Sequence, residues 1–275
     1  MARHPSSRPI ARRLLLAWAL CGAAASATAD CGRPLQVAVS DLGVGSYQEQ
    51  GQIRGLIPEL AQELAARSGC RLELVFLPRA RALQDFDVGR IDIITSMLRT
   101  PERDALGVYL PYGYTKHDLL LAPEAAAGIA SLADLIRRPE LRLGVVRGIR
   151  TNSRVDLHLE QLLATRRAEY SSDFANLAAK LAARRVQAVI MPNALHIKLR
   201  RDGALAPDIA TVNIPEARPQ VLGLYVNRAA VPAAAAGRLG EQLAAMVRTG
   251  WVRQAYVRHF GEAETRRMEL AALER

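Results

Sequence analysis

The chain has 275 residues, about half of them apolar, with 23% charged residues and a mean hydropathy close to zero. This length suits roughly two domains, and the composition excludes a disordered chain, a collagen-like chain and a multi-span membrane protein. The 37 Lys and Arg residues outnumber the 27 Asp and Glu residues, which gives a net charge of +10. Because the arginines are scattered along helical sequence without interleaved aromatic residues, we predict no nucleic-acid partner.

The first 29 residues, 1–29, have the pattern of a secretory signal peptide. A basic start that ends in Arg12 and Arg13 precedes an apolar run at residues 14–20, and the sequence A-T-A closes the segment. This order predicts cleavage after the A-T-A site and export to the periplasm. The apolar run is too short for a membrane anchor, which needs about twenty apolar residues.

After this segment, short β-branched runs alternate with longer helical patterns, as is typical of βαβ units around parallel sheets. The predicted strands are residues 35–40, 72–77, 91–95, 141–146, 188–191 and 221–227. The predicted helices are residues 57–68, a short helix from 80, 131–137, 154–163, 172–184 and Ala-rich sequence that runs to 260. The pattern changes near residues 112–116, which indicates a crossover between two sets of elements. The charged tail at 262–275 is expected to be peripheral.

Two cysteines, Cys31 and Cys70, remain beyond the predicted signal peptide. Each lies just before a predicted strand, and disulfides persist in exported proteins. If these two strands are neighbours in a parallel sheet, their starting ends lie side by side, within the Cα spacing of a disulfide. We expect a bridge, with two free buried cysteines as the alternative. Because no Cys or His cluster has the spacing of a metal site, neither a metal nor another cofactor is expected.

Several short motifs keep a fixed order over roughly residues 33–261. They lie at residues 51–60, 89–92 (G-R-I-D), 100–103 (T-P-E-R), 110–112 (L-P-Y), 141–148 and 250–251 (G-W), followed by Tyr256 and residues 260–261. In these motifs and their spacing the chain resembles the periplasmic solute-binding proteins of polar amino-acid ABC transporters, the extracellular solute-binding protein family 3.

The resemblance implies an α/β fold of two lobes, a type II periplasmic binding protein with two hinge crossovers. Lobe 1 then holds residues 31–115 plus 222–275, and lobe 2 holds residues 116–221. The crossings near residues 114–115 and 221–222 form the hinge. A ligand that touches both lobes stabilises a closed state that it alone can bridge. The chain is expected to act as a monomer.

Arg103 matches the arginine of the family's T-x-E-R pattern, which implies that its guanidinium holds the α-carboxylate of the ligand. A planar guanidinium matches a carboxylate with two parallel hydrogen bonds and keeps its charge when partly desolvated. The alternative is a surface arginine that pairs with Glu102 or Asp104. The family uses main-chain groups beside this clamp, which implies that Ser96 and Leu98 also lie at the ligand.

Other positions depart from the family's amino-acid-binding pattern. Pro192 stands where an aspartate commonly pairs with the ligand's amino group, so this position offers no charge to an ammonium. Arg150 lies beside Gly148, where small hydroxyl residues are usual, and Arg79 lies near the position of an aromatic residue that often covers the ligand. Asp41 is the nearby acidic candidate.

These departures lead to a hypothesis about the charge of the ligand. A pocket that holds Arg79, Arg103 and Arg150 without compensating carboxylates attracts an anion and repels a free amine. We therefore predict a ligand with more than one carboxylate, or another acidic metabolite. The alternative is that Arg79 and Arg150 point to the outer surface, where long basic side chains are common.

The resemblance implies capture rather than catalysis. The expected function is that of an exported protein that binds a small polar solute with a carboxylate, an amino acid or an organic acid, for an ABC permease of the inner membrane. No G-x-S-x-G, H-E-x-x-H or phosphate-loop motif is present, so no enzyme activity is predicted. Two alternatives stay open: a periplasmic lyase or dehydratase of the same fold that acts on a prephenate-like acid, and the ligand-sensing subunit of a membrane sensor.

Overall fold

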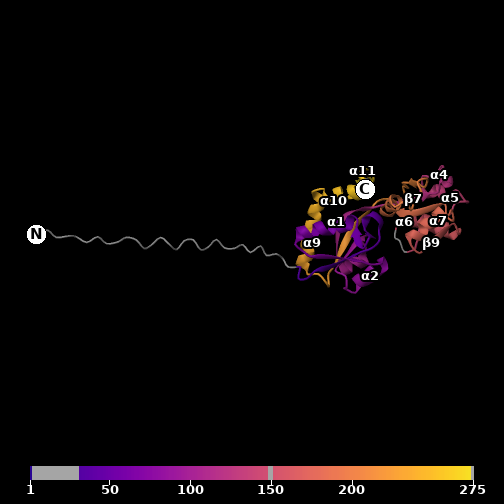
Figure 1. The fold of residues 1–275 in the computed structure, drawn as a ribbon. Coiled ribbons are helices and arrows are strands. Elements are labelled where there is room, and N and C mark those ends of the chain that lie inside the picture. The colour runs from indigo at the N-terminus through magenta and orange to yellow at the C-terminus, as the bar shows by residue number, and fades with distance from the viewer. Residues whose placement is uncertain (2–30, 148–150, 274–275) are drawn as a thin grey trace.

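Two five-stranded sheets form the framework of the computed structural model, which describes residue 1 and residues 31–147 and 151–273. The strand order is β4-β1-β5-β12-β6 in the first sheet and β11-β7-β10-β8-β9 in the second. Both ends of the described chain contribute to the first lobe, built on the first sheet, and the middle of the chain forms the second lobe (Figure 1). The predicted signal peptide, apart from Met1, lies outside the described residues.

The strands of the first sheet are β1 (Leu35–Val39), β4 (Leu72–Phe76), β5 (Ile93–Met97), β6 (Gly107–Thr115) and β12 (Gln220–Asn227). Those of the second sheet are β7 (His117–Leu121), β8 (Leu143–Val146), β9 (Ala168–Ser171), β10 (Ala188–Pro192) and β11 (Ala210–Val212). A separate hairpin consists of β2 (Tyr47–Glu49) and β3 (Gln52–Arg54). β1 is parallel to both β4 and β5, whereas β12 is antiparallel to β5 and β6.

Helices pack against both sheets. They are the 3-10 helix η1 (Gly43–Gly45) and the α-helices α1 (Leu56–Ser68), α2 (Arg79–Asp87), α3 (Pro101–Leu106), α4 (Pro123–Ala126), α5 (Leu132–Ile136), α6 (Ser153–Ala164), α7 (Phe174–Ala182), α8 (Asn193–Arg201), α9 (Ala233–Arg248), α10 (Trp251–Phe260) and α11 (Glu262–Leu273). Ser131, Asn152 and Asp173 cap α5, α6 and α7 by accepting hydrogen bonds from backbone amides of the first turn. Within the described part of the chain, no helix combines the length and the apolar character needed to span a membrane.

Cys31 and Cys70 form a disulfide bond, with their Cα atoms 5.5 Å apart. β1 and β4 are parallel neighbours in which Leu35 pairs with Leu72, so the starting ends of the two strands lie side by side. Both cysteines are buried in the core of the first lobe. The predicted bridge is confirmed, and the alternative of two free cysteines is wrong.

The chain passes between the two sheets at two adjacent places. β6 ends at Thr115 in the first sheet and β7 begins at His117 in the second, so Lys116 alone lies between them. β11 ends at Val212 in the second sheet, and β12 begins at Gln220 in the first. Because Gln220 pairs with Thr115, the two passages run close together.

The C-terminal helix α11 is an integral part of the fold, so the prediction of a peripheral tail is wrong. Thr265 and Met268 on this helix are 2% and 1% exposed. Arg267 reaches Asp118 of the second lobe, with an Nη2 to Oδ2 distance of 2.6 Å. Of its charged residues, Arg267 forms an ion pair across the two lobes, whereas Glu262 and Glu269 pair with Arg253 of α10.

Candidate functional site

Three strands of the first sheet end at one edge, and three of the predicted ligand residues lie there. β1 runs between β4 and β5 and is parallel to both, so the carboxyl ends of these strands meet at the same edge. Asp41 follows β1, Arg79 follows β4 as the first residue of α2, and Ser96 lies near the end of β5. In open α/β sheets, ligands bind outside the carboxyl ends of the strands.

The side chain of Arg79 turns back onto the end of β5. Its Nη1 donates to the carbonyl oxygen of Thr95 at 2.9 Å, and its Nη2 donates to that of Ser96 at 2.8 Å. Nη2 also lies 2.7 Å from the Sδ of Met97. Arg79 is partly buried by these contacts, so the alternative of a side chain on the outer surface is wrong for this residue.

Arg103 approaches the same segment from α3. The hydroxyl of Thr100, the N-cap, accepts the backbone amide of Arg103 at 3.4 Å, and Pro101 occupies the first helical turn. The Nη1 of Arg103 donates to the carbonyl oxygen of Leu98 at 3.4 Å. Arg79 and Arg103, called the arginine pair, therefore both contact the backbone of residues 95–98.

The arginine pair forms no ion pair with any described carboxylate. Asp104, one of the expected partners of Arg103, instead binds Arg99 at 2.9 Å and the hydroxyl of Tyr225 at 2.9 Å. Burial and the charge of Arg103 lower the pKa of Arg79 to about 10. Because this value lies well above neutral pH, Arg79 keeps its positive charge, and this edge of the sheet is cationic.

Ser96 and Tyr112 add hydroxyl groups beside the arginine pair. The Oγ of Ser96 lies 3.2 Å from the hydroxyl oxygen of Tyr112. Ser96 has a φ of 55°, in the left-handed region that residues other than glycine rarely adopt, and such conformations cluster at functional sites. Burial raises the pKa of Tyr112 to about 12, so its phenol stays protonated and is a hydrogen-bond donor.

Asp41 and Pro192 are not in contact with the arginine pair. Asp41 is exposed, and its Oδ1 accepts the backbone amide of Gly43 at 3.4 Å. Pro192 ends β10 in the second sheet, opposite His117 of β7, and offers no charge. Asn193, the next residue, directs its amide to the Oε1 of Glu264 at 2.8 Å.

The structure thus brings four predicted ligand residues together at one sheet edge: Arg79, Ser96, Leu98 and Arg103. Gly148 and Arg150, the remaining two, lie outside the described residues. The contact between Arg79 and Met97 has no signal in the sequence, because it depends on how the chain turns after β4. The role of all these residues in ligand binding stays a prediction.

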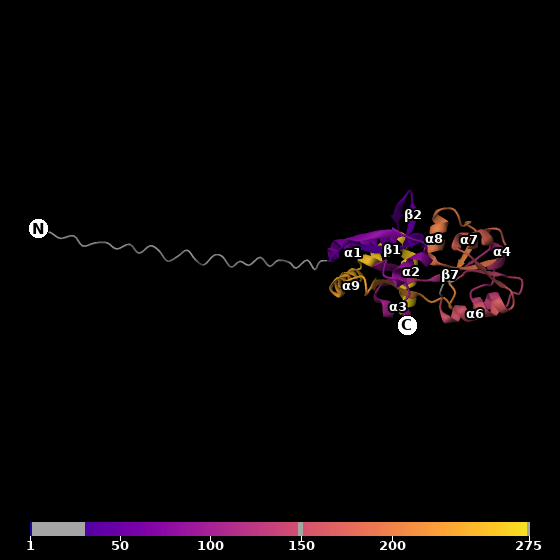
Figure 2. The same cartoon turned by 90° about the horizontal axis from the view of Figure 1, so that it is seen from below.

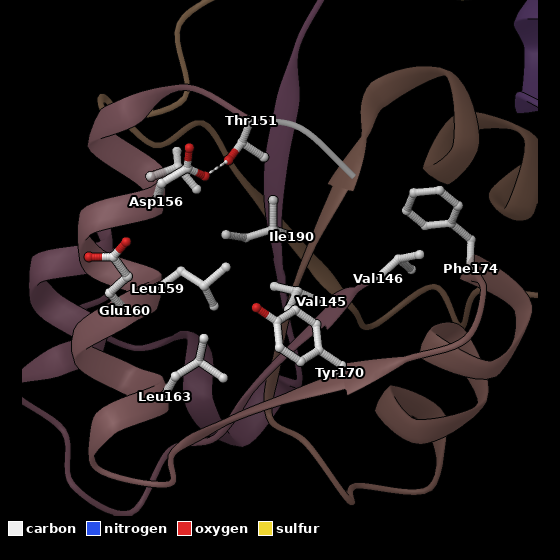
Figure 3. A pocket seen from close by; sticks show the side chains of 11 residues that line it. Val145, Val146, Thr151, Asp156, Leu159, Glu160, Leu163, Tyr170, Phe174 and Ile190 are labelled. Atoms are coloured by element: carbon white, nitrogen blue, oxygen red, sulfur yellow. Dashed lines mark hydrogen bonds between the residues drawn. The ribbon is translucent and has the colours of Figure 1, made fainter. Parts of the chain in front are cut away.

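A separate pocket of about 290 Å³ lies in the second lobe, between α6 and the strands β8, β9 and β10 (Figure 3). Val145, Leu159 and Ile190 line it with apolar side chains. At its rim, the hydroxyl of Thr151 donates to the Oδ1 of Asp156 at 2.5 Å. In the described chain, no group of His, Cys, Asp or Glu side chains is arranged to hold a metal ion in this pocket or elsewhere.

Five buried or partly buried ionisable side chains meet where β7, α8 and α11 come together. Asp118 accepts hydrogen bonds from Nη1 and Nη2 of Arg267 at 2.8 and 2.6 Å. The Nε2 of His196 lies 2.8 Å from the same carboxylate, and the Nζ of Lys116 lies 3.3 Å from it. Arg267 also binds Glu264 at 2.7 and 2.8 Å. These five residues are called the charged cluster.

The charged cluster joins the two lobes beside the first passage between the sheets. Lys116 and Asp118 lie at that passage, and Arg267 belongs to α11, which packs on the first lobe. Burial opposes ionisation of Asp118, but hydrogen bonds from His196 and Arg267 hold its pKa far below the usual range. A carboxylate engaged in this way is a poor general base, so the cluster has a structural rather than a catalytic arrangement.

A family model accounts for most of the chain. The model of the bacterial extracellular solute-binding proteins, family 3, matches residues 38–262. The chain belongs to this family. The resemblance seen in the motifs is thereby confirmed. No curated protein matches this family 3 protein.

Solved structures share the fold of this family 3 protein. The ancestral amino acid-binding protein AncCDT-1, a precursor of cyclohexadienyl dehydratase, is 19% identical, with a TM-score of 0.66 over 82% of this chain and 95% of its own. The arginine-, lysine-, histidine-binding protein ArtJ from Geobacillus stearothermophilus is 15% identical, with a TM-score of 0.67 over 84% and 96%. A histidine kinase sensor domain with similarity to periplasmic binding proteins is 17% identical, with a TM-score of 0.66 over 83% and 96%. These likenesses confirm the predicted two-lobed type II fold.

Proposed function

We propose that this family 3 protein is an exported, monomeric binding protein that captures a small polar solute with a carboxylate group for an ABC permease of the inner membrane. The proposal rests on the position of the Arg103 guanidinium. It lies partly buried at the carboxyl edge of the first sheet, without an ion-pair partner among the described carboxylates. A carboxylate that enters this edge forms two parallel charge-assisted hydrogen bonds with such a group.

The mechanism is closure of two lobes on the solute. Lobe 1 comprises residues 31–115 and 222–275, lobe 2 comprises residues 116–221, and the two adjacent passages between the sheets act as the hinge. The ligand contacts are Arg103, Arg79, Asp41 and the main chain of Ser96 and Leu98 from lobe 1, and Gly148, Arg150 and Pro192 from lobe 2. A solute that bridges both sides shifts the population toward the closed form, which the permease then recognises.

Export to the periplasm has two supports. Residues 1–29 have the order of a cleaved signal peptide, and the bond between Cys31 and Cys70 suits a compartment in which disulfides persist. Membership of an extracellular solute-binding family agrees with both.

An enzyme of this fold would need an acid or base at its substrate, and Asp118 next to His117 is an acid beside a histidine. The carboxylate of Asp118 is already engaged by Arg267 and His196, so we favour binding without turnover. The likeness to AncCDT-1 makes a dehydratase the competing function, and the likeness to a histidine kinase sensor domain makes a sensor the second. The purified protein can be mixed with a prephenate-like acid and the absorbance of the acid followed over time. If the acid is consumed, the protein is a dehydratase and the proposed binding function is wrong.

Thermal unfolding of the purified protein tests the proposal, after bound solute has been removed by unfolding and refolding. The panel consists of amino acids, dicarboxylates, keto acids and polyamines. A ligand at a hundredfold excess over its Kd stabilises the folded state by about 2.7 kcal/mol, which raises the Tm measurably. We expect such a rise with a carboxylate-bearing solute, and its loss in Arg103→Ala.

The matched control is Arg81→Ala, because Arg81 is exposed and pairs with Asp85 at 2.6 Å on the same helix as Arg79. This variant is expected to keep the full response to the solute. The proposal is wrong if no acid raises the Tm, or if Arg103→Ala responds as the wild type does.

A further inference from the structure

The arginine pair has no carboxylate partner among the described residues, whereas several other arginines of this molecule have one. Arg33 pairs with Asp92 at 2.6 Å, and Arg267 pairs with Asp118 at 2.6 Å. Arg167 is bound by main-chain carbonyl groups, but it uses Nε, Nη1 and Nη2 for them and so serves as a structural brace. The arginine pair instead places two guanidiniums on one short backbone segment without a described carboxylate.

Repulsion between the two guanidiniums favours an anion at this edge. Both guanidiniums contact the backbone of residues 95–98, and the charge of Arg103 adds to burial in lowering the pKa of Arg79. Like charges in a partly desolvated site raise its free energy, since their interaction is weakly screened there. A ligand with one negative charge offsets one guanidinium, whereas a ligand with two offsets both.

Hydrogen-bond donors are also in excess at this edge. A guanidinium has five N–H donors, and Arg103 donates one bond of 3.4 Å to Leu98 among its contacts with described residues. The protonated phenol of Tyr112 adds a neutral donor beside Ser96. An ammonium group needs acceptors, and the acidic candidate Asp41 is exposed and already accepts the amide of Gly43.

We propose that the arginine pair makes this protein select solutes with two negative charges, small dicarboxylates in the first instance, over zwitterionic amino acids. Arg103 holds one carboxylate, and Arg79 holds or neutralises the second. The inference rests on the proposed function, because it specifies the class of solute that the same site captures.

Titration calorimetry with three matched series of solutes tests the inference. Each series keeps one chain length and changes one end group, as in glutarate, 4-aminobutyrate and pentanoate, whose variable ends are a carboxylate, an ammonium and a methyl group. The other two series are built in the same way on succinate and adipate. At the chain length that binds best, we expect the dicarboxylate to bind at least about tenfold more tightly than both analogues, because it adds a charge-assisted pair.

Variants of the two arginines separate their roles. Arg79→Gln is expected to remove the preference for the dicarboxylate while monocarboxylate binding persists, and Arg79→Lys is expected to retain the preference because the charge is kept. Arg103→Gln is expected to weaken the binding of every acid. Arg81→Gln on the same helix is the control and is expected to bind as the wild type does.

The outcomes distinguish this inference from the proposed function. The inference is wrong, and the proposed function stands, if an amine or methyl analogue or an amino acid binds as tightly as the best dicarboxylate. It is also wrong if Arg79→Gln weakens all end groups equally while its ligand-free Tm matches that of the wild type. The inference and the proposed function are both wrong if no amino acid and no acid of any series binds.

Discussion

His117 couples the stability of the protein to pH through a single buried side chain. It is 6% exposed, and its Nε2 has no hydrogen-bond partner among the described residues. Burial lowers its pKa to about 4, although Asp118 and Asp156 act in the opposite direction. In an unfolded chain the pKa of histidine is about 6.5, so the unfolded state binds a proton that the folded state excludes.

Above about pH 6.5, His117 is neutral in both states and does not lower the free energy of unfolding. As the pH falls from about 6.5 toward about 4, the unfolded state takes up a proton and the free energy of unfolding decreases. The size of the loss is up to ~3 kcal/mol for a shift of this size. We expect His117→Leu to flatten the decline of the free energy of unfolding across this range, measured by urea denaturation at a series of pH values. His158→Leu, at a partly exposed position on α6, is the control. An unchanged pH profile in His117→Leu contradicts the prediction.

For individual residues of the candidate site, the sequence allowed a partial prediction. Arg103 follows from the T-P-E-R motif, and its position beside Leu98 agrees with the expected clamp. The direction of Arg79 was open, because a shift of one residue at the start of α2 turns a side chain from the sheet edge to solvent. The carbonyl groups of Thr95 and Ser96 settle that direction through contacts between residues that are distant in sequence.

At the level of elements, α11 is the helix that fastens the second lobe to the first. Its Arg267 pairs with Asp118, which is fully buried, and its Glu264 binds the amide of Asn193 at the start of α8. Removal of one partner from a buried ion pair leaves the other charge without compensation. The cost of such a loss is about 3–5 kcal/mol.

We expect Arg267→Met to lower the free energy of unfolding by an amount of that order and to speed amide hydrogen exchange in α8 and α11. Arg266→Met provides a matched control, because Arg266 is the preceding residue, is 67% exposed and pairs with Glu262 at 3.6 Å. A surface pair of this kind contributes about 1 kcal/mol or less. Equal losses in the two variants would show that the charged cluster does not hold the lobes together.

Elements were predictable from the sequence where periodicity was strong and local. The helix α1 and the parallel strands β1 and β4 follow from apolar spacing. The crossover predicted near residues 112–116 lies where β6 ends and Lys116 leads into the second sheet. The strand β6 itself is not predicted, because Pro111 and Gly113 interrupt its pattern, yet as an edge strand that pairs with β12 alone it tolerates a proline. The role of α11 could not be predicted, because the acid that pairs with Arg267 lies 149 residues away in sequence.

At the scale of the whole molecule, the lobes also touch through η1 and α8, which lies on the side of the second lobe that faces the first (Figure 2). Gly43 of η1 has a φ of +62°, and a methyl group on it would overlap the backbone of Ala194 in α8. Lys198 of α8 lies over the ring of Tyr47 at 4.3 Å. The position of the second lobe therefore depends on the absence of a side chain at residue 43.

Gly43→Ala is expected to lower the free energy of unfolding by about 1–3 kcal/mol, because it strains the left-handed backbone. It is also expected to increase the radius of gyration in small-angle X-ray scattering, because η1 and α8 are pushed apart. Gly45→Ala is the control: the nearest atom to its new methyl group, Cβ of Leu42, is 3.8 Å away. If the radius of gyration of Gly43→Ala equals that of the control, this contact does not set the arrangement of the lobes.

The strand order of the first sheet determines when that sheet can be completed as the chain emerges. β12 lies between β5 and β6, so β5 has β1 as its one neighbour in the sheet, and β6 has none, until residues 220–227 are available. The second sheet uses residues 117–212 and is complete earlier along the chain. In a polypeptide that emerges amino end first, all strands of the second sheet are therefore available before the first sheet can be completed, although β1, β4 and β5, whose ends hold Arg79 and Ser96, emerge before them.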